Sequence, residues 1–416
     1  MKILFLSQIV PYPPHGGVLQ RGFNIIREIA KRNELHLLAF NHPDVLKTER
    51  LVEESKAVLG AYCRTLEYVD LWPKRSEFHR YAGYLWGGLS GLPFSVLAHR
   101  SLRFRRAIAR IVKAEQVDIV HYDTLALAQF RDMAEGLPKV LTHHNIESQL
   151  MERRSGSESG IFARTYTGLQ AEKIRAYEME ECGKFDLNIT VSDADAAQLK
   201  TMVPGLRTAV VPNGVDIEYF MSDNGNSAME PALIYTGGMN MYANRDAVLY
   251  FLEHIWQKIR AEIPGLRFYA VGQDPPPELH KIAEKDIGVV VTGYVDDIRP
   301  YVTRSSVYVV PLRVGGGTRL KILDAMAMGK AIVSTTIGAE GIDATDGKNI
   351  LLADNPEDFA ARVVTILRTS DLRMNLGREA RRLVENEYSW GTVGKRLQEA
   401  YEDVLDRARA KRGDWR

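Results

Sequence analysis

Cysteine and long apolar runs are the two features that this chain lacks most clearly. Its 416 residues contain only Cys63 and Cys182, which form neither a CxxC pair nor a cysteine–histidine ligand spacing. The sequence therefore predicts inert, reduced thiols in preference to a redox pair, with no disulfide framework and no zinc site. No segment approaches the roughly 18 apolar residues of a membrane-spanning helix.

A secretion signal and a strong net charge are also missing. The first run, MKILFLSQIVPYPP, has one lysine, and Pro11, Pro13 and Pro14 interrupt it before a signal core is complete. We therefore expect a first strand there and a cytoplasmic protein. The 54 Lys and Arg against 53 Asp and Glu give a net charge of +1, which offers no electrostatic reason for a nucleic-acid partner.

The first half of the chain alternates short aliphatic runs with longer amphipathic segments. The runs lie at residues 3–6, 35–40, 119–122, 140–143, 187–191 and 209–211. Strands that are apolar on both faces, with room for helices between them, are typical of a parallel sheet covered on both sides. The sequence therefore predicts an α/β fold.

A second unit of the same kind follows a polar linker at residues 222–231. The aliphatic runs restart there, at residues 233–235, 268–271, 289–292, 307–310, 332–335 and 350–352. Two doubly wound units bind ligands beyond the carboxyl ends of their strands, so a cleft between them is expected. Residues 378–409 have apolar positions at helical spacing and predict a docked helix, with a frayed basic tail at 407–416.

The stretch at residues 309–326 reads as strand, glycine-rich turn and helix. Gly316 and Gly317 let a ligand approach the backbone, and the free N–H groups of a helix start favour an anion. Thr318 can cap the helix or bind an oxygen. The stretch matches neither GxxxxGK[ST] nor GxGxxG, so no nicotinamide cofactor is indicated.

Two cations, Arg319 and Lys321, lie in the first turn of that predicted helix. A cation there is unfavourable unless an anion is bound, which points to an anionic ligand. The alternative is a tight glycine connection whose cations are simply solvated.

Further motifs occur along the chain in a consistent order. They are Pro13-Pro14-His15-Gly16-Gly17, Thr142-His143-His144-Asn145, Val191-Ser192, Val211-Pro212-Asn213-Gly214-Val215-Asp216 with Phe220 beyond it, Tyr235-Thr236-Gly237-Gly238, Val271-Gly272, Thr292-Gly293-Tyr294-Val295 and, after the glycine-rich stretch, residues 327–334. Together they resemble glycosyltransferase family four, the retaining enzymes of the GT-B fold.

This resemblance implies a GT-B architecture of two doubly wound, Rossmann-like domains that face each other across a cleft. The expected parts are an acceptor-side domain at 1–212, a donor-side domain at 213–385 and a C-terminal helix at 386–416 that packs back on the first domain. The implied activity is retaining, metal-independent transfer from a nucleotide-diphosphate sugar, without a cofactor.

The resemblance also implies roles for individual residues. His144, Arg319 and Lys321 are expected to be catalytic, with His143, His121 and Glu147 as alternatives to the histidine. The residues expected to bind the donor are Gly16, Gly17, Gly238, Arg245, Val295, Gly316, Gly317, Thr318 and Asp324.

Two departures from the family pattern bear on the site. The family often has two glutamates eight positions apart, where this chain has Gly316 and Asp324, so backbone N–H groups must replace one carboxylate and the other is shorter by one methylene. The usual Arg and Lys pair of the second domain is reduced to Arg245. We therefore infer that Arg319 and Lys321 bind the diphosphate.

No metal is expected, because the sequence lacks a DxD motif suited to a nucleotide-bound cation. Asp193-Ala194-Asp195 has the right letters but opens a predicted helix, where capping explains it better.

Residues 74–113 are basic and aromatic, with Glu77 as their only acidic residue. Arg80, Trp86, Arg103 and Arg106 are the candidate contacts there. They suit a saccharide or polyprenyl-diphosphate-linked glycan acceptor, or an anionic membrane at the inner face of the plasma membrane. The alternative is a helical pair with core aromatics and solvated arginines.

The expected role is polysaccharide or glycolipid assembly of the bacterial type. Two other functions fit parts of the sequence. A GT-B sugar-nucleotide epimerase would need no acceptor. A catalytically silent binding or scaffold subunit is suggested by Gly316 and Asp324.

Overall fold

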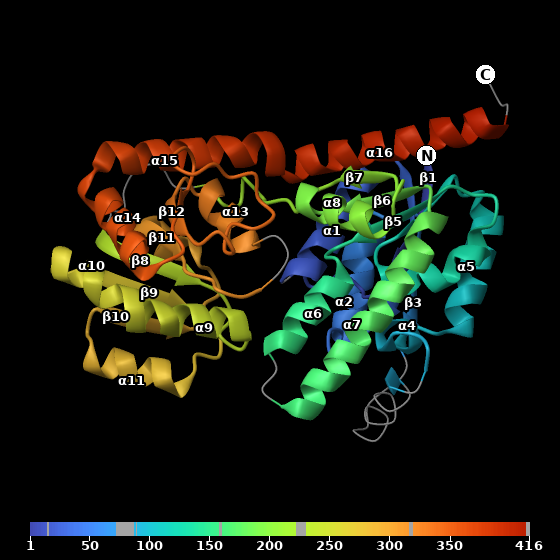
Figure 1. Ribbon diagram of the computed structural model, residues 1–416. Helices are drawn as coiled ribbons and strands as arrows, with labels where there is room; N and C mark the ends of the chain where they lie inside the picture. Colours follow the sequence, from blue (N-terminus) through green and yellow to red (C-terminus); the bar gives the residue numbers. More distant parts are fainter. Residues whose placement is uncertain are drawn as a thin grey trace. The chain divides into compact units, whose positions relative to one another are not determined.

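The computed structural model describes residues 1–14, 16–71, 87–88, 90–157, 160–221, 230–315 and 319–412. The chain forms two compact units, Met1–Pro212 with Val393–Arg416, and Asn213–Thr392 (Figure 1). The second unit extends to Thr392 and not only to residue 385. The reason is local: the Val215 amide donates to the Tyr388 carbonyl at 2.8 Å, and Tyr388 lies in the core of the second unit.

The first unit is built on a parallel seven-stranded sheet with the order β3-β2-β1-β4-β5-β6-β7. Its strands are β1 (Lys2–Ser7), β2 (Glu34–Asn41), β3 (Thr65–Asp70), β4 (Ile119–Tyr122), β5 (Lys139–His143), β6 (Leu187–Thr190) and β7 (Thr208–Val210). Strand β3 was missed from the sequence, because it is an edge strand in which only Val69 is buried. The other six lie where the aliphatic runs predicted them.

Helices cover both faces of this sheet. They are α1 (Gly17–Ala30), α2 (Glu49–Gly60), α4 (Phe94–Ala98), α5 (Leu102–Glu115), η1 (Leu125–Ala134), α6 (Glu147–Ser157), α7 (Ile161–Glu181), η2 (Cys182–Lys184) and α8 (Asp193–Met202). Amphipathic segments form them because each buries one stripe of side chains. In α5, for example, the buried side chains are Phe104, Ala107, Ile108 and Ile111, at a spacing of three or four residues.

The second unit repeats the plan with a parallel six-stranded sheet of order β10-β9-β8-β11-β12-β13. Its strands are β8 (Glu230–Thr236), β9 (Arg267–Val271), β10 (Val289–Gly293), β11 (Ser305–Val310), β12 (Ala331–Ser334) and β13 (Leu351–Leu352). Its helices are α9 (Tyr242–Tyr250), η3 (Phe251–Ile255), α10 (Trp256–Glu262), α11 (Pro277–Lys285), α12 (Arg299–Arg304), α13 (Leu320–Ala327), α14 (Pro356–Arg368), α15 (Ser370–Leu383) and η4 (Val384–Tyr388).

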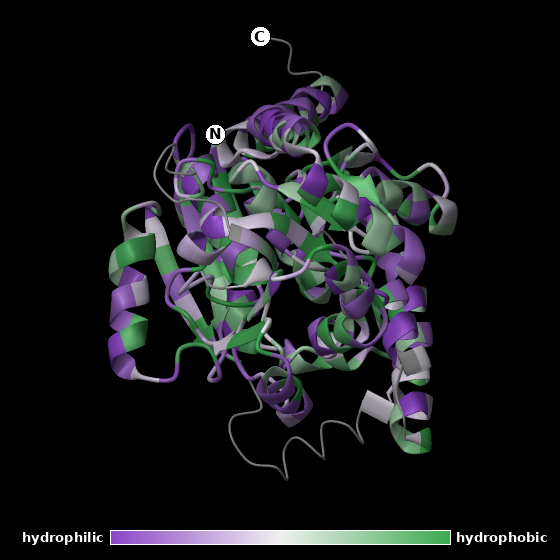
Figure 2. Cartoon of the chain, turned by 90° about the vertical axis from the view of Figure 1, so that its left-hand side faces the viewer, coloured by the Kyte–Doolittle hydropathy of each residue, from purple (hydrophilic) through white to green (hydrophobic). Residues whose placement is uncertain are grey.

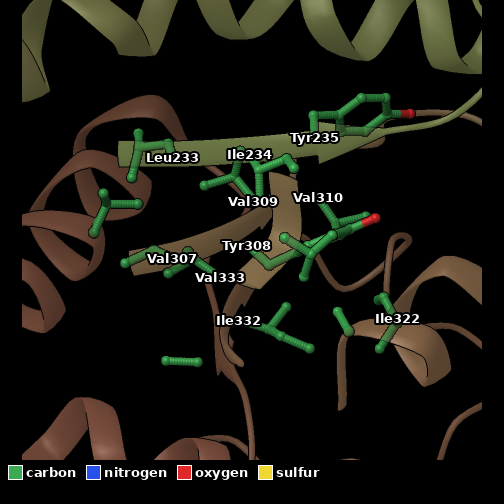
Figure 3. Close-up of a cluster of buried hydrophobic side chains, with 14 of the residues drawn as sticks. Leu233, Ile234, Tyr235, Val307, Tyr308, Val309, Val310, Ile322, Ile332 and Val333 are labelled. Carbon is green, nitrogen blue, oxygen red and sulfur yellow. The ribbon is translucent and has the colours of Figure 1, made fainter. Parts of the chain in front are cut away.

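Buried, largely apolar central strands hold each unit together. In the second unit, Ile234 of β8, Val309 of β11 and Ile332 of β12 have no exposed surface, and they lie in one cluster with Ile322 of α13 (Figure 3). Figure 2 shows the helices with alternating hydrophobic and hydrophilic turns. Since the faces of the sheets are used in packing against the helices, the ends of the strands are the places available for ligands.

The last helix, α16 (Trp390–Arg412), begins in the second unit and joins the first at Val393. Its Tyr401 is completely buried, and the Tyr401 hydroxyl lies 2.6 Å from His121 Nδ1. His121 Nε2 in turn lies 2.9 Å from the Thr142 hydroxyl. The basic tail expected to fray from residue 407 is helical as far as Arg412, and residues 413–416 lie outside the described chain.

Removing the Tyr401 hydroxyl tests this docking. Tyr401→Phe leaves a buried imidazole nitrogen without its partner and should lower the free energy of unfolding of the first unit by about 1–3 kcal/mol. Tyr401→Ala should cost about 3–5 kcal/mol, because it also opens a cavity. Urea denaturation measures both, with Glu399→Ala on the exposed face of α16 as the control. Equal stability of all three variants would refute this docking role.

Candidate functional site

Each sheet has a switch point, where the strand order reverses and the loops on either side diverge. In the second unit it lies between β8 and β11, and in the first between β1 and β4. Open α/β sheets bind ligands at this place, beyond the carboxyl ends of the strands. The residues that follow these four strands are therefore the candidates for a site.

Lys321 lies at the switch point of the second unit, in the first turn of α13. Its Nζ donates to the Tyr235 hydroxyl and to Asn244 Oδ1, both at 2.8 Å. Asn244 also accepts from the Tyr235 hydroxyl at 2.7 Å and donates from Nδ2 to the Gly238 carbonyl at 2.8 Å. Groups from β8, α9 and α13 thus hold the ammonium in one place.

Two glycines make room for the cations. Gly237 has φ +147°, and a Cβ there would lie 2.6 Å from Lys321 Nζ. Gly315 has φ +133°, and a Cβ there would lie 2.7 Å from Arg319 Nη2. A side chain at either position would strain the backbone and would displace the end of a cationic side chain, so the turns favour glycine and leave room for the cations.

Burial shifts the pKa values of two ionisable residues at this edge, Lys321 and Asp324. Burial, reinforced by the Arg319 guanidinium, lowers the pKa of Lys321 to about 7, while Asp324 opposes the shift. Burial raises the pKa of Asp324 to about 7, against the pull of Lys321. A bound anion would stabilise the charged form of Lys321 that burial disfavours.

The other predicted donor residues of this unit occupy neighbouring loops. Gly238 follows β8, Arg245 is exposed in the first turn of α9, and Val295 follows β10 with its side chain against the core. Arg319 is the N-cap residue of α13, the position that Thr318 was expected to take. Gly316, Gly317 and Thr318 lie outside the described residues.

In the first unit, His144 follows β5 and lies beside an acidic residue. His144 Nε2 is 3.3 Å from Oδ1 of Asp123, which follows β4, and the side chains are 12% and 5% exposed. Glu147, at the start of α6, accepts from the Thr124 hydroxyl at 2.9 Å, and burial raises its pKa. An imidazole, a carboxylate and a carboxyl group thus meet at the carboxyl ends of β4 and β5.

Gly16 and Gly17 complete this edge. Gly16 has φ +85° as the N-cap residue of α1, and open space surrounds the position of a Cβ there. The loop that follows β1 therefore brings bare backbone to the switch point of the first unit.

The two other histidines that the sequence offered as alternatives, His121 and His143, are structural. His121 is bound by Tyr401 and Thr142, and burial lowers its pKa to about 3. His143 lies 2.9 Å from Asn188 Oδ1, and burial lowers its pKa to about 4. Both are almost fully buried within the sheet, so His144 is the histidine that the switch point can use.

Three residues beside the candidate side chains were not assigned a role from the sequence. Asp123 could have been found as the polar residue after Tyr122. Tyr235 begins one of the motifs quoted above, but its contact with Lys321, like that of Asn244, depends on folding, which brings β8 and α9 to the ammonium.

In the described part of the chain, no three potential metal ligands at either switch point have ligand atoms within 4.8 Å of one another. The group that could share an ion is Glu34, His36 and Glu115, whose ligand atoms lie within 4.8 Å of one another. Glu34 opens β2, so this group is at the opposite, amino edge of the sheet. The DAD triplet opens helix α8, as expected: Ser192 is the N-cap residue, and its hydroxyl accepts from the Asp195 amide at 3.1 Å.

Arg103 and Arg106 are exposed on α5 and line a surface pocket of about 710 Å³ next to β3. The pocket also contains Glu67, which pairs with Arg110, and Asp70, so its charge is mixed. Arg80 and Trp86 lie outside the described residues. Within the described ranges, no helix has both the length and the apolar character needed to cross a bilayer.

Comparison with known families assigns both units. Residues 15–219 match the family described as Glycosyltransferase Family 4, and residues 230–369 match Glycosyl transferases group 1. The chain therefore belongs to the family-four type of glycosyltransferases, and its two Rossmann-like units form the GT-B fold.

Individual relatives agree with this assignment. A Klebsiella pneumoniae protein described as an uncharacterized 44.6 kDa protein in the cps region is 23% identical over 381 residues, 87% of this chain and 90% of that protein. An uncharacterized glycosyltransferase of Methanocaldococcus jannaschii is 31% identical over 125 residues, 29% of this chain and 31% of that protein.

Solved structures share the fold. HepE of Anabaena in complex with UDP has a TM-score of 0.68 at 16% identity, covering 97% of this chain and 100% of that one. Sucrose-phosphate synthase of Thermosynechococcus elongatus has a TM-score of 0.68 at 17% identity, covering 98% and 100%.

The lowered pKa of Lys321 predicts a pH dependence of stability. The unfolded chain, with a lysine pKa of about 10.4, binds more protons than the folded one above pH 7, so this residue makes stability rise with pH between about 7 and 10. Lys321→Met should reduce that slope by up to about 1.4 kcal/mol per pH unit. Urea denaturation of the ligand-free protein at pH 7.5 and 9, about the middle of that range, measures it.

Lys321 lowers the pKa of Asp324, so Lys321→Met should raise that pKa further, and the comparison is therefore made in an Asp324→Asn background. Lys281→Met, on the exposed face of α11, is the matched control and should keep the wild-type slope. An unchanged slope in Lys321→Met would show that the ammonium is not destabilised by burial.

Proposed function

We propose that this glycosyltransferase transfers a sugar from a nucleoside diphosphate donor to a saccharide or polyprenyl-diphosphate-linked acceptor, with retention of the anomeric configuration and without a metal ion. The observation that carries the proposal is Lys321, held by Tyr235 and Asn244 beside Arg319 at the second switch point. Two cations in a partly buried site, at the start of a helix, suit the charge of a leaving diphosphate.

The donor side follows from that charge. Cleavage of the bond between the anomeric carbon and the diphosphate leaves negative charge on the phosphate oxygens, which Arg319, Lys321 and the backbone of Gly316 and Gly317 would stabilise. Thr318 would add a hydroxyl to the same oxygens. HepE, which shares the fold, has been solved with UDP and with UDP-glucose, which supports a nucleotide-sugar donor here.

Ribose and base would lie along the neighbouring loops. Asp324 would accept hydrogen bonds from the ribose hydroxyls, which requires its ionised form. The diphosphate would bind the nearby cations, so the carboxylate would remain available to the ribose. Gly238, Arg245 and Val295 follow or flank the strand ends around the nucleotide.

The first unit would supply the acceptor side. His144 would contact the reacting sugar or the acceptor near the anomeric carbon, and Asp123 would orient its imidazole through the 3.3 Å contact. Gly16 and Gly17 would let bare backbone approach the phosphate or the acceptor. A donor phosphate oxygen would take the proton of the acceptor hydroxyl, so no separate protein base is required for retention.

Polysaccharide assembly is the process we propose. The relative from Klebsiella pneumoniae is described by its place in a cps region, and it covers most of this chain. The proposed site of action is the cytoplasmic face of the membrane, where Arg103 and Arg106, together with Arg80 and Trp86, are candidates for acceptor or lipid contact.

Alanine substitution tests the diphosphate site. Arg319→Ala and Lys321→Ala should each reduce turnover at least tenfold, and by roughly a hundredfold if each stabilises the leaving group in the transition state. Release of nucleoside diphosphate from UDP-, GDP-, ADP- and TDP-sugars measures it, and circular dichroism checks the fold. Lys281→Ala is the matched control for loss of a cation. Near-normal turnover in both variants would end the proposal.

The stereochemistry and the metal requirement are tested together. With an α-linked donor, the product should carry an α-glycosidic bond, which the anomeric proton coupling in NMR reports. Turnover should persist in EDTA, because in the proposed site the cations of Arg319 and Lys321 stabilise the leaving diphosphate in place of a metal ion. A β-linked product would exclude retention, and loss of turnover that Mg²⁺ restores would exclude metal independence.

A further inference from the structure

The α6–α7 hairpin of the first unit exposes two large apolar side chains at its tip. Ile161 is 82% exposed and Phe162 is 93% exposed, and they are neighbours in the first turn of α7. The buried face of α7 is formed by Thr167, Gln170, Ala171, Ile174, Tyr177, Glu178 and Glu181. Since that stripe begins only at Thr167, the packing of α7 does not explain the two apolar residues.

The hairpin projects beyond the sheet edge that carries His144. Helix α7 has 21 residues, about 31 Å, whereas strands β5 and β6 are only about 13–17 Å long. Helix α6 leaves the carboxyl end of β5, and α7 returns to the amino end of β6, so the excess length overhangs the carboxyl edge (Figure 1). The tip is thus on the same side of the unit as its switch point.

The hairpin holds its tip in a defined position. The Ser155 hydroxyl of α6 donates to the Arg164 carbonyl of α7 at 2.9 Å. At Gly168 a Cβ would lie only 3.4 Å from the Ser155 oxygen, so the two helices approach closely there. Ile161 and Phe162 are therefore presented by paired helices.

The sequence around the tip has a small excess of cations. Residues 150–169 contain Arg153, Arg154 and Arg164 against Glu152 and Glu158. Helix α5 starts at the same edge, because it leads into β4, and its first residues are Leu102, 71% exposed, and the exposed Arg103 and Arg106. Both helices pack on one face of the sheet, since Phe104 and Ile174 share a core cluster.

We propose that this surface, formed by Ile161 and Phe162 at the hairpin tip and by Leu102, Arg103 and Arg106 at the start of α5, docks on an anionic lipid bilayer. Two apolar side chains offer much less than the roughly 800 Å² per partner that a stable protein interface buries. A bilayer interface, in contrast, takes up small apolar projections flanked by cations. Docking through this surface would turn the edge that carries His144 toward the lipid. The inference rests on the proposed function in one respect only, that a lipid-linked acceptor would then reach that edge.

Vesicle co-sedimentation of the full chain tests the proposal. Wild type should bind vesicles of phosphatidylglycerol and phosphatidylcholine, bind pure phosphatidylcholine less, and lose binding as salt rises. The double variant Ile161→Ser/Phe162→Ser should bind the anionic vesicles about tenfold or more weakly, since both inserted side chains are lost. Ile287→Ser is the matched control, because Ile287 is 91% exposed in the second unit, and it should bind like wild type.

The inference would be overturned if wild type did not bind anionic vesicles, or if the double variant bound them as well as wild type does. A change of oligomeric state in the double variant on size-exclusion chromatography would also overturn it, because the tip would then be a contact between copies of this chain. Release of nucleoside diphosphate, measured in solution without vesicles, distinguishes failure of the lipid-docking inference from failure of the proposed function. The double variant should keep that turnover, whereas Lys321→Ala should lose turnover and keep vesicle binding.

Discussion

The ammonium of Lys321, held close to Arg319 in a partly buried place, is the constraint on which the donor side of this protein depends. Two cations near each other and away from water raise the free energy of the ligand-free protein, and burial accordingly lowers the pKa of Lys321 to about 7. Tyr235 and Asn244 supply oxygens but no charge, so they fix the position of the ammonium without neutralising it. The ammonium is thereby ordered in the ligand-free protein, and a bound anion would relieve this strain.

The same edge explains the departures from the family pattern. Where the usual second glutamate is shortened to Asp324, burial raises its pKa to about 7, so this carboxyl contributes less negative charge to the empty site than an exposed one would. This carboxyl therefore compensates the ammonium of Lys321 only in part. The shortened carboxylate and the proposed reliance on Arg319 and Lys321 would be two parts of one electrostatic arrangement.

The first unit is organised around a different kind of interaction, a buried neutral network. Tyr401, His121 and Thr142 link the returning helix α16 to two central strands, and burial keeps the imidazole uncharged. Because this network uses His121 internally, the exposed end of β5 is left to His144 and its neighbour Asp123. The structural histidines and the candidate catalytic one are separated by burial and partners, although His143 and His144 are adjacent in the chain.

Sequence alone determined the two α/β units, the positions of nearly all strands along the chain, and the glycine-rich turn with its two cations. These features depend on local runs of apolar residues and on neighbouring positions. It could not find β3, a half-exposed edge strand. It favoured His144 over His121 and His143 only through the family resemblance, because the burial of these histidines is a property of the packed sheet. Tertiary structure alone decided that Lys321 meets Tyr235 and Asn244, which are 86 and 77 positions away in the chain. Contacts over such separations leave no local pattern, since only the parallel pairing of β8 with β11 brings their ends together.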